Sequence, residues 1–170
     1  RRSFIMRTPI LLLALCAGSV AQAHVTLEYQ VAAAASSYKA SFKVGHGCGI
    51  SPTRQVVVQI PPAMRNAHPM PKPGWTTELQ REGDAVTRIS WTAKSRDDAL
   101  PSTHYDEFVL VAQTPAQAGP VYWPVSQVCE EGRMDWTQVP QPGQKLSDLK
   151  SPAAYLEILP ADGAAAVHHH

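Results

Sequence analysis

Apolar and polar residues alternate with a period of two along much of this chain, which is the spacing of a half-buried β-strand. The segment YKASFKV, residues 38–44, alternates apolar side chains with lysine and serine. Further strands are predicted at residues 55–61, 88–93, 107–113, 121–128 and 154–159. Turn sequences such as PKPG, REGD, AQAGP and QPGQ separate them. Short strands at this spacing predict an all-β protein folded as a β-sandwich.

Helical patterns are weak throughout the chain. Residues 62–67 and 146–151 could each form a single helical turn, and no segment carries an apolar stripe over three turns. Two of the four tryptophans, Trp91 and Trp123, fall within strand patterns, so we expect them in the core. Trp136 follows a turn-like sequence and could belong to the core or to the wall of a site.

The first predicted strand covers residues 24–31. Strict alternation would place one set of side chains on one face and the other set in the core. The first set is His24, Thr26, Glu28 and Gln30, and the second is Val25, Leu27, Tyr29 and Val31.

The chain opens with a sequence typical of export. From Met6 onward, a basic residue precedes an apolar run that ends in Ala-Gln-Ala, the small-residue pattern at which signal peptidase cuts. We therefore expect residues 1–23 to be upstream residues and a signal peptide, with no stable membrane insertion after cleavage. The mature protein would begin at His24 in a periplasmic or extracytoplasmic compartment.

One domain is expected over residues 24–160, because domains typically run to about 100–200 residues. Residues 161–170 resemble a tail that ends in the remnant of a purification tag at His168–His170. The chain has 15 Lys and Arg against 14 Asp and Glu. This balance argues against a nucleic-acid or anionic-membrane partner.

Two cysteines, Cys48 and Cys129, remain once the signal peptide with Cys16 is removed. In an oxidising compartment they predict a disulfide. A two-thiolate metal site is the alternative, although neither cysteine lies in a CxxC pair. A disulfide would also remove Cys48 as the nucleophile of a thiol enzyme with His46 or His104 as its base.

His24 is the strongest candidate for metal chemistry. Cleavage before it would expose an α-amine, which ordinarily has a pKa of about 8, beside an imidazole, which ordinarily has a pKa of about 6.5. Amine and imidazole nitrogens suit Cu(II), and those of one N-terminal histidine can close a chelate ring on it. Glu28 could add an oxygen ligand, but four strand residues span about 13 Å. Asp106 or Glu107, from a neighbouring strand, would not have this limit.

Several motifs occur in one order along nearly the whole mature chain: AHVTLE (23–28), GHGCGISPT (45–53), PKPGW (71–75), YDEFVL (105–110), and VYWPVSQVCEEG (121–132) leading into DWTQVP. In this combination the chain resembles the YcnI-like (DUF1775) family of extracytoplasmic copper-associated proteins. The resemblance implies an immunoglobulin-like β-sandwich that binds Cu(II) through a mono-histidine brace at the mature N-terminus. It also implies a role in copper acquisition, trafficking or homeostasis, with a copper chaperone or a membrane copper transporter as partner.

Carried over position by position, the resemblance makes His24 the N-terminal ligand and Trp136 the tryptophan near the metal. The acidic ligand falls on Glu28 or Glu107. Val31 stands where some family members have a further glutamate, so the choice of carboxylate stays open. The match around HGC and QVC also implies the Cys48–Cys129 bridge.

We expect a non-catalytic copper-binding domain, because one histidine supplies fewer nitrogen ligands than the two-histidine brace of an oxidative copper enzyme. An oxidative enzyme would need a second histidine beside His24, which the fold would have to bring from His46 or His104. The other alternative is an immunoglobulin-like interaction module without metal, in which His24 is incidental.

Overall fold

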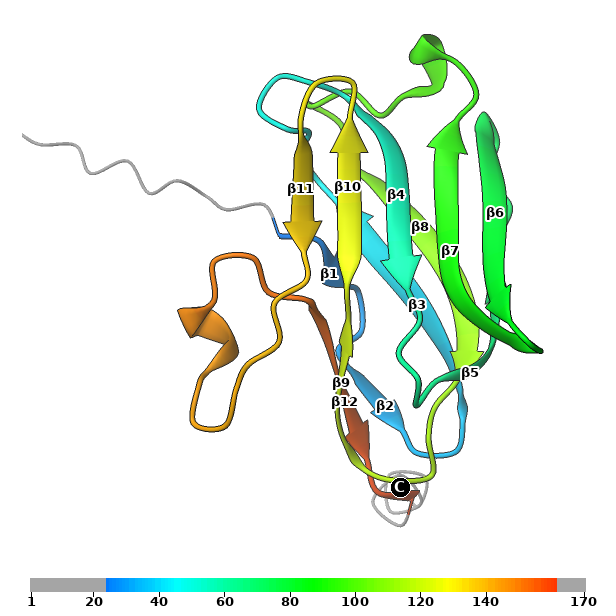
Figure 1. Ribbon diagram of the computed structural model, residues 1–170, viewed down its shortest axis with the longest axis vertical. Helices are drawn as coiled ribbons and strands as arrows, with labels where there is room; N and C mark the ends of the chain where they lie inside the picture. The colour runs from blue at the N-terminus through cyan, green and yellow to red at the C-terminus, as the bar shows by residue number, and fades with distance from the viewer. Residues whose placement is uncertain (1–23, 162–170) are drawn as a thin grey trace, which may run out of the picture.

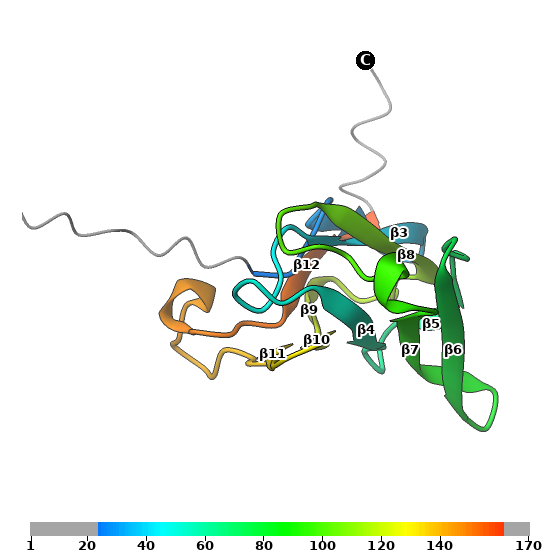
Figure 2. The same cartoon turned by 90° about the horizontal axis from the view of Figure 1, so that it is seen from above.

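The computed structural model describes residues 24–161, in which twelve β-strands form three sheets. Two larger sheets lie face to face, and Figure 2 shows them as separate layers. Two short 3-10 helices, η1 (Arg96–Asp98) and η2 (Leu146–Asp148), lie in loops. The predicted signal peptide, residues 1–23, and residues 162–170 of the predicted tail lie outside the described residues. The predicted all-β sandwich is confirmed.

The four-stranded sheet forms the back layer in Figure 1. Its strands, in order across the sheet, are β1 (Thr26–Leu27), β3 (Ser37–Val44), β8 (Asp106–Gln113) and β5 (Arg65–Pro69). All neighbours are antiparallel. Pro69 is tolerated in β5 because this strand lies at the sheet edge, where a missing N–H breaks no ladder on the open side.

The five-stranded sheet forms the front layer in Figure 1. Its strands, in order, are β11 (Arg133–Trp136), β10 (Val125–Cys129), β4 (Thr53–Gln59), β7 (Ala85–Ala93) and β6 (Trp75–Glu82). The predicted REGD turn joins β6 to β7, with Glu82 paired to Ala85. Gly83 has φ 59°, a left-handed conformation that glycine adopts without a steric penalty.

A small three-stranded sheet closes one end of the sandwich. Its strands are β2 (Val31–Ala33), β12 (Ala154–Leu159) and β9 (Gly119–Trp123). The sequence predicted one strand over residues 121–128, but the chain breaks at Pro124 and passes from β9 into β10 of the larger sheet. Proline has no N–H to donate to a ladder, so the strand changes sheets where it occurs.

Aromatic side chains fill the space between the layers. Trp91, Trp123, Phe42 and Phe108 are all fully buried. Phe42 lies edge-on to Trp123 with ring centroids 5.6 Å apart, and Trp91 lies edge-on to Phe108 at 5.8 Å. Edge-to-face pairs at these distances are the favoured aromatic geometry. The predicted core positions of the two tryptophans are confirmed.

The predicted first strand is only partly right. Val25 and Leu27 are 2% and 1% exposed, as the alternation requires, but Tyr29 and Val31 are 66% and 55% exposed. The reason is that β1 ends at Leu27 and the chain continues into β2 of another sheet, which breaks the alternation.

Three strands, β5, β6 and β11, were not predicted. Most residues of β6 are exposed and polar, so its sequence carries no burial alternation. In the segment 62–67, a hydrogen-bonded turn closes at Met64 and β5 begins at Arg65, so any helical turn ends there. The single turn predicted within residues 146–151 is present as η2.

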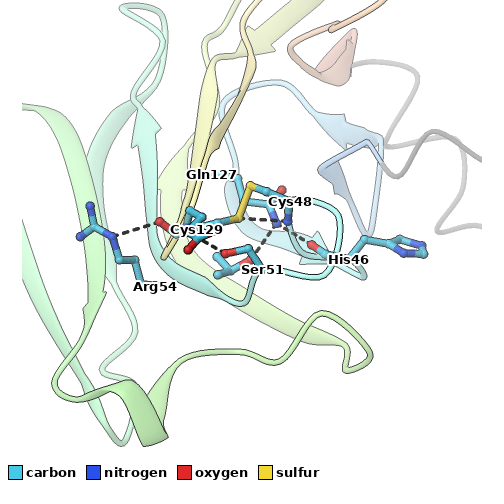
Figure 3. Close-up of a disulfide and its surroundings, with 8 residues drawn as sticks. His46, Cys48, Ser51, Arg54, Gln127 and Cys129 are labelled. Atoms are coloured by element: carbon cyan, nitrogen blue, oxygen red, sulfur yellow. Dashed lines mark hydrogen bonds between the residues drawn. A yellow bond between two sulfur atoms is a disulfide. The ribbon is translucent and has the colours of Figure 1, made fainter.

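The predicted disulfide joins Cys48 to Cys129 at one end of the sandwich, with Cα atoms 6.0 Å apart (Figure 3). It ties the loop after β3 to the end of β10. Backbone contacts reinforce it: the Cys48 N–H lies 3.1 Å from Cys129 Sγ, and the Glu130 N–H donates to the Pro52 carbonyl at 3.0 Å. The turn 129–132, which leads into β11, is thereby fixed against this loop.

Replacing Cys48 and Cys129 by serine should lower the free energy of unfolding by about 4 kcal/mol, since the bridge closes a loop with a sequence separation of 81 residues. Urea denaturation followed by tryptophan fluorescence measures this. The parent protein under reducing conditions should show the same loss. Equal stability of the two proteins would contradict the prediction.

Candidate metal centre

The structure brings His24 and Trp136 into contact. Their ring centroids lie 5.1 Å apart with the planes tilted by 55°. His24 lies just before β1, which begins at Thr26, and Trp136 is the last residue of β11. β1 and β11 are edge strands of the two layers, so this contact lies where the layers meet along one side of the sandwich (Figure 1). Trp136 is 6% exposed and His24 is partly exposed.

The indole of Trp136 has an unused polar group. Within residues 24–161, its Nε1 is buried and has no hydrogen-bond partner. An indole N–H can only donate, so a group that satisfies it must be an acceptor. Leaving a buried donor unpaired typically costs about 1–3 kcal/mol. Among the described residues Trp123 Nε1, deep in the core, is unpaired in the same way, so this N–H does not by itself mark a ligand site.

The two candidate carboxylates gather around Lys43 instead. The Glu28 carboxylate pairs with Lys43 Nζ at 3.2 Å, and both side chains are partly exposed. Lys43 of β3 lies opposite Thr26 of β1 on one side and opposite Glu107 of β8 on the other. Residues opposite each other point to the same face of a sheet. Glu28 and Glu107 thus flank one lysine on the outer face of the four-stranded sheet.

Glu107 has a second partner in Tyr105, whose hydroxyl donates to its Oε1 at 2.6 Å. Burial, followed by the hydrogen bond and charge of Glu107, raises the pKa of Tyr105 to about 12. Asp106, the other acidic candidate, forms an ion pair with Lys72 Nζ at 2.6 Å. Each candidate carboxylate therefore already has a protein partner.

The predicted site residues thus fall into two groups. His24 contacts Trp136, while Glu28 and Glu107 surround Lys43. Within the described part of the chain, no three His, Cys, Asp or Glu side chains converge on a common point. Lys43 and Tyr105 were not predicted as site residues. The alternation of residues 38–44 had placed Lys43 on the outer face, but only the pairing of β1, β3 and β8 shows what it faces.

His46 and His104, the other histidines named as possible ligands or bases, are both exposed. The backbone carbonyl of His46 accepts a hydrogen bond from Gln127 Nε2. Nδ1 of His104 lies 2.9 Å from Thr103 Oγ1.

The donor chemistry at His24 fits copper. An imidazole and the amine that cleavage would release are both nitrogen ligands of the kind Cu(II) prefers. The Trp136 ring packs against one side of the histidine. With two nitrogens from His24 bound, the Cu(II) ion would need only a few further ligands from other residues or water.

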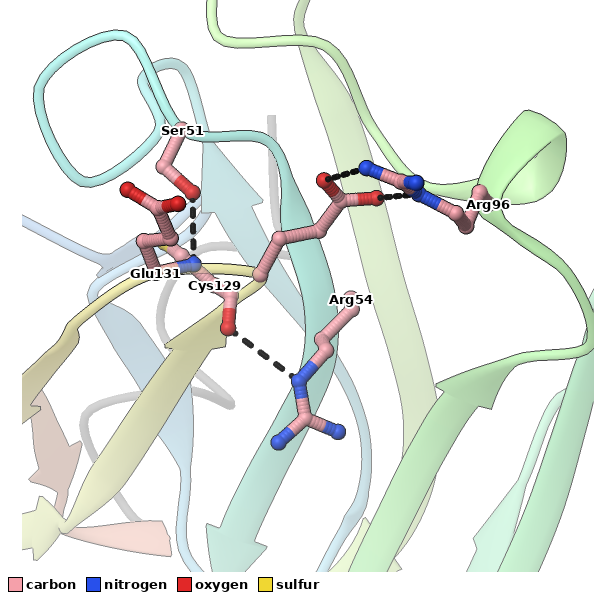
Figure 4. Close-up of polar contacts among 6 residues, drawn as sticks. Ser51, Arg54, Arg96, Cys129 and Glu131 are labelled. Carbon is pink, nitrogen blue, oxygen red and sulfur yellow. Dashed lines mark hydrogen bonds and ion pairs between the residues drawn. The ribbon is translucent and has the colours of Figure 1, made fainter.

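A hollow lies beside the disulfide, away from His24. It has a volume of about 420 Å³, and Arg54, Arg96 and Glu130 are among the residues that line it. Arg96 makes a two-pronged pair with Glu130, with both distances 3.2 Å, and Arg54 Nε donates to the Cys129 carbonyl (Figure 4). None of the predicted metal ligands is among its lining residues. Two arginines and two glutamates line it, so its charges balance.

Within residues 24–161, no helix has the length and hydrophobicity needed to cross a membrane.

Comparison with known proteins gives a family match and a fold match. The family model described as "Domain of unknown function (DUF1775)" matches residues 24–158. An uncharacterized protein from Nocardia farcinica, whose crystal structure is described as revealing an immunoglobulin-like fold, is 25% identical with a TM-score of 0.68. The match covers 79% of this chain and 97% of that one, and it confirms the immunoglobulin-like sandwich.

A non-cellulosomal cohesin from the hyperthermophilic archaeon Archaeoglobus fulgidus is 9% identical, with a TM-score of 0.41, over 86% of this chain and 98% of its own. None of the curated proteins compared with the chain matches it.

The Tyr105 contact gives a titration test. In a Glu107→Gln variant the pKa of Tyr105 should fall from about 12 toward the ordinary value of 10.0, because the negative charge that disfavours the phenolate is gone. Burial should keep it above that value. Alkaline titration of tyrosinate absorbance measures the shift, and the difference from a Tyr105→Phe variant isolates this residue. An unchanged step would show that Glu107 does not control it.

Proposed function

The chain belongs to the DUF1775 family, and from this premise we propose that it is a periplasmic Cu(II)-binding protein whose metal site is built on His24. The observation that carries the proposal is the contact between His24 and Trp136. It places His24, the residue best suited to bind Cu(II), against the buried indole of Trp136, where the edges of the two layers meet. Copper is the cargo of the protein in this proposal.

Signal-peptide cleavage before His24 is the step that would complete the site. The amide nitrogen that joins His24 to Ala23 is a poor ligand, whereas a free amine binds Cu(II) well once it is deprotonated. The amine and Nδ1 would then hold the ion as a brace. Cleavage would also make metal binding conditional on export, so that copper is bound only outside the cytoplasm.

A carboxylate ligand would have to leave its present partner. Glu28 would give up a partly exposed ion pair with Lys43, and such surface pairs contribute only about 0–1 kcal/mol. Glu107 would give up a hydrogen bond from Tyr105 at 2.6 Å. Of the two glutamates, Glu28 would therefore give up the weaker interaction.

The biological role we propose is to hold copper and pass it on, in acquisition, trafficking or homeostasis, without catalysis. Trp136 supports retention because its ring shields one side of the histidine from water. A copper chaperone or a membrane copper transporter would be the partner. An immunoglobulin-like interaction module without metal is the competing function, and the same experiment separates the two.

We predict that the cleaved, tag-free protein binds one Cu(II), and that His24→Ala lowers its affinity at least 100-fold, because the variant keeps the N-terminal amine but loses the imidazole and with it the chelate ring. Mass spectrometry first establishes that the chain begins at His24. Titration followed by electron paramagnetic resonance then measures stoichiometry and nitrogen couplings.

His68→Ala is the matched control, since His68 is an exposed histidine on β5, and it should bind as the parent does. Weak binding that is the same in all three proteins would contradict the proposal. It would leave the interaction module as the better explanation.

Trp136 provides an internal probe of the location of the ion. Cu(II) quenches nearby indole fluorescence, so binding beside His24 should strongly reduce the emission of Trp136. Most of the copper-dependent quenching should disappear in Trp136→Phe, while the other three tryptophans remain. If the variant is quenched as fully as the parent, the ion lies elsewhere.

A further inference from the structure

The two layers also meet on the side of the sandwich opposite His24 and Trp136. The edge strands on this side are β5 of the back layer and β6 of the front layer. β5 contacts β7 near the hairpin that joins β6 to β7, as Figures 1 and 2 both show. A hollow with a volume of about 370 Å³, which we call the Arg65 hollow, opens at this place. Its volume is in the usual range for small-molecule sites.

A β-bulge in β5 turns two basic side chains to the same face. Arg65 pairs with Gln113 of β8 and His68 pairs with Val111, so β5 contains one residue more than β8 between these pairs. In a regular strand Arg65 and His68 would point to opposite faces, and the extra residue brings them together. Asn66, within the bulge, has φ 51°, and its side-chain amide donates to Gln113 Oε1 at 3.0 Å. Both Arg65 and His68 line the Arg65 hollow.

A second bulge lies across the hollow, where the pairing of β6 with β7 shifts register between Gln80 and Arg81. Two positions before Arg81, Leu79 pairs with the fully buried Ile89, so this face of β6 is turned toward the back layer. Arg81 follows on that face and lines the same hollow as Arg65. Bulges occur often beside functional sites because they redirect side chains, and here two of them bring arginines from both layers to one hollow.

The two guanidinium groups have most of their hydrogen-bond donors unused. Within residues 24–161, Arg65 has no ion pair and no side-chain hydrogen bond, and Arg81 donates only to the Asp84 carbonyl, through Nη1 at 3.3 Å. Asp84 is the acidic residue among those that line the hollow, so two guanidinium groups face one carboxylate. Arginine stays charged at any ordinary pH. The Arg65 hollow is therefore net positive, unlike the hollow beside the disulfide.

The floor of the Arg65 hollow is apolar. Met64 and Ala67 are 5% and 3% exposed, and Val86 is partly buried against the core. All three line the hollow. An apolar surface with a few convergent polar groups is the usual composition of a small-molecule site. A ligand could place an apolar body on this floor and an anionic group between the arginines.

We propose that the Arg65 hollow binds a small organic anion, namely a carboxylate attached to an apolar body. One guanidinium can donate two parallel hydrogen bonds to a carboxylate, and Arg65 and Arg81 would approach it from the two layers. An inward-pointing arginine on an edge strand can also serve to discourage strand pairing, but that role would need no second arginine across the hollow. The site lies on the opposite side of the sandwich from His24, so it does not depend on copper.

The test uses benzoate as the probe and metal-free, tag-free protein that begins at His24. Calorimetric titration should show one saturable site with a dissociation constant of about 1 mM, as expected for a ligand of this size. Arg65→Gln and Arg81→Gln should each weaken binding about tenfold, because each removes a charge-assisted donor. Arg88→Gln is the matched control. Arg88 is an exposed arginine of β7 that does not line the Arg65 hollow, so this variant should bind as the parent does.

Two further probes separate the parts of the ligand. Benzyl alcohol lacks the carboxylate and acetate lacks the apolar body, so both should bind more weakly than benzoate. Arg65 and Arg81 are exposed, so their replacement should leave the fold intact, and thermal denaturation checks this. The proposal is overturned if the parent shows no saturable binding of benzoate, if Arg88→Gln loses as much affinity as the other variants, or if benzyl alcohol binds as well as benzoate.

Discussion

The buried amide of Gln127 is the interaction that fixes the loop after β3 against β10 at this end of the sandwich. Its side chain is 1% exposed, and its Nε2 donates both to the His46 carbonyl and to Thr53 Oγ1. An unpaired amide at this depth would cost about 1–3 kcal/mol for each lost bond. The loop that leaves β3 must therefore return to this point on β10. The relative positions of the two layers at this end follow from it.

The disulfide and the amide act on the same loop by different means. The Cys48–Cys129 disulfide restricts the conformations of the unfolded chain, whereas the hydrogen bond of Gln127 holds the folded loop in one conformation. Because the turn after Cys129 leads into β11, both constraints also bear on where Trp136 lies. His24 approaches that tryptophan from the other layer. The pair is thus held from both sides.

Strands could be predicted from the sequence where buried and exposed side chains alternate, and were missed where they do not. The strand at 38–44 and the core tryptophans could be predicted because burial there repeats every second residue. β6 could not, because it is an edge strand with little to bury, and the break after Leu27 depends on a change of sheet that local pattern does not encode. Pro124 did carry a signal, since proline inside a strand pattern argues against a central strand.

For the site, residue chemistry identified His24, and the resemblance identified Trp136. What the sequence could not show was which side chains share a face. Glu28 and Glu107 are far apart in the chain and are brought together around Lys43 only by the order of three strands.

The passage of the chain through Pro124 also has a thermodynamic consequence. A single run of backbone belongs to the small sheet as β9 and to the front layer as β10, and β12, the partner of β9, contacts β1 of the back layer as well. None of the three sheets can separate without pulling on another, so the domain should melt in one cooperative transition. Any ligand that binds only the folded form then stabilises all three sheets by the same amount, however local its contacts.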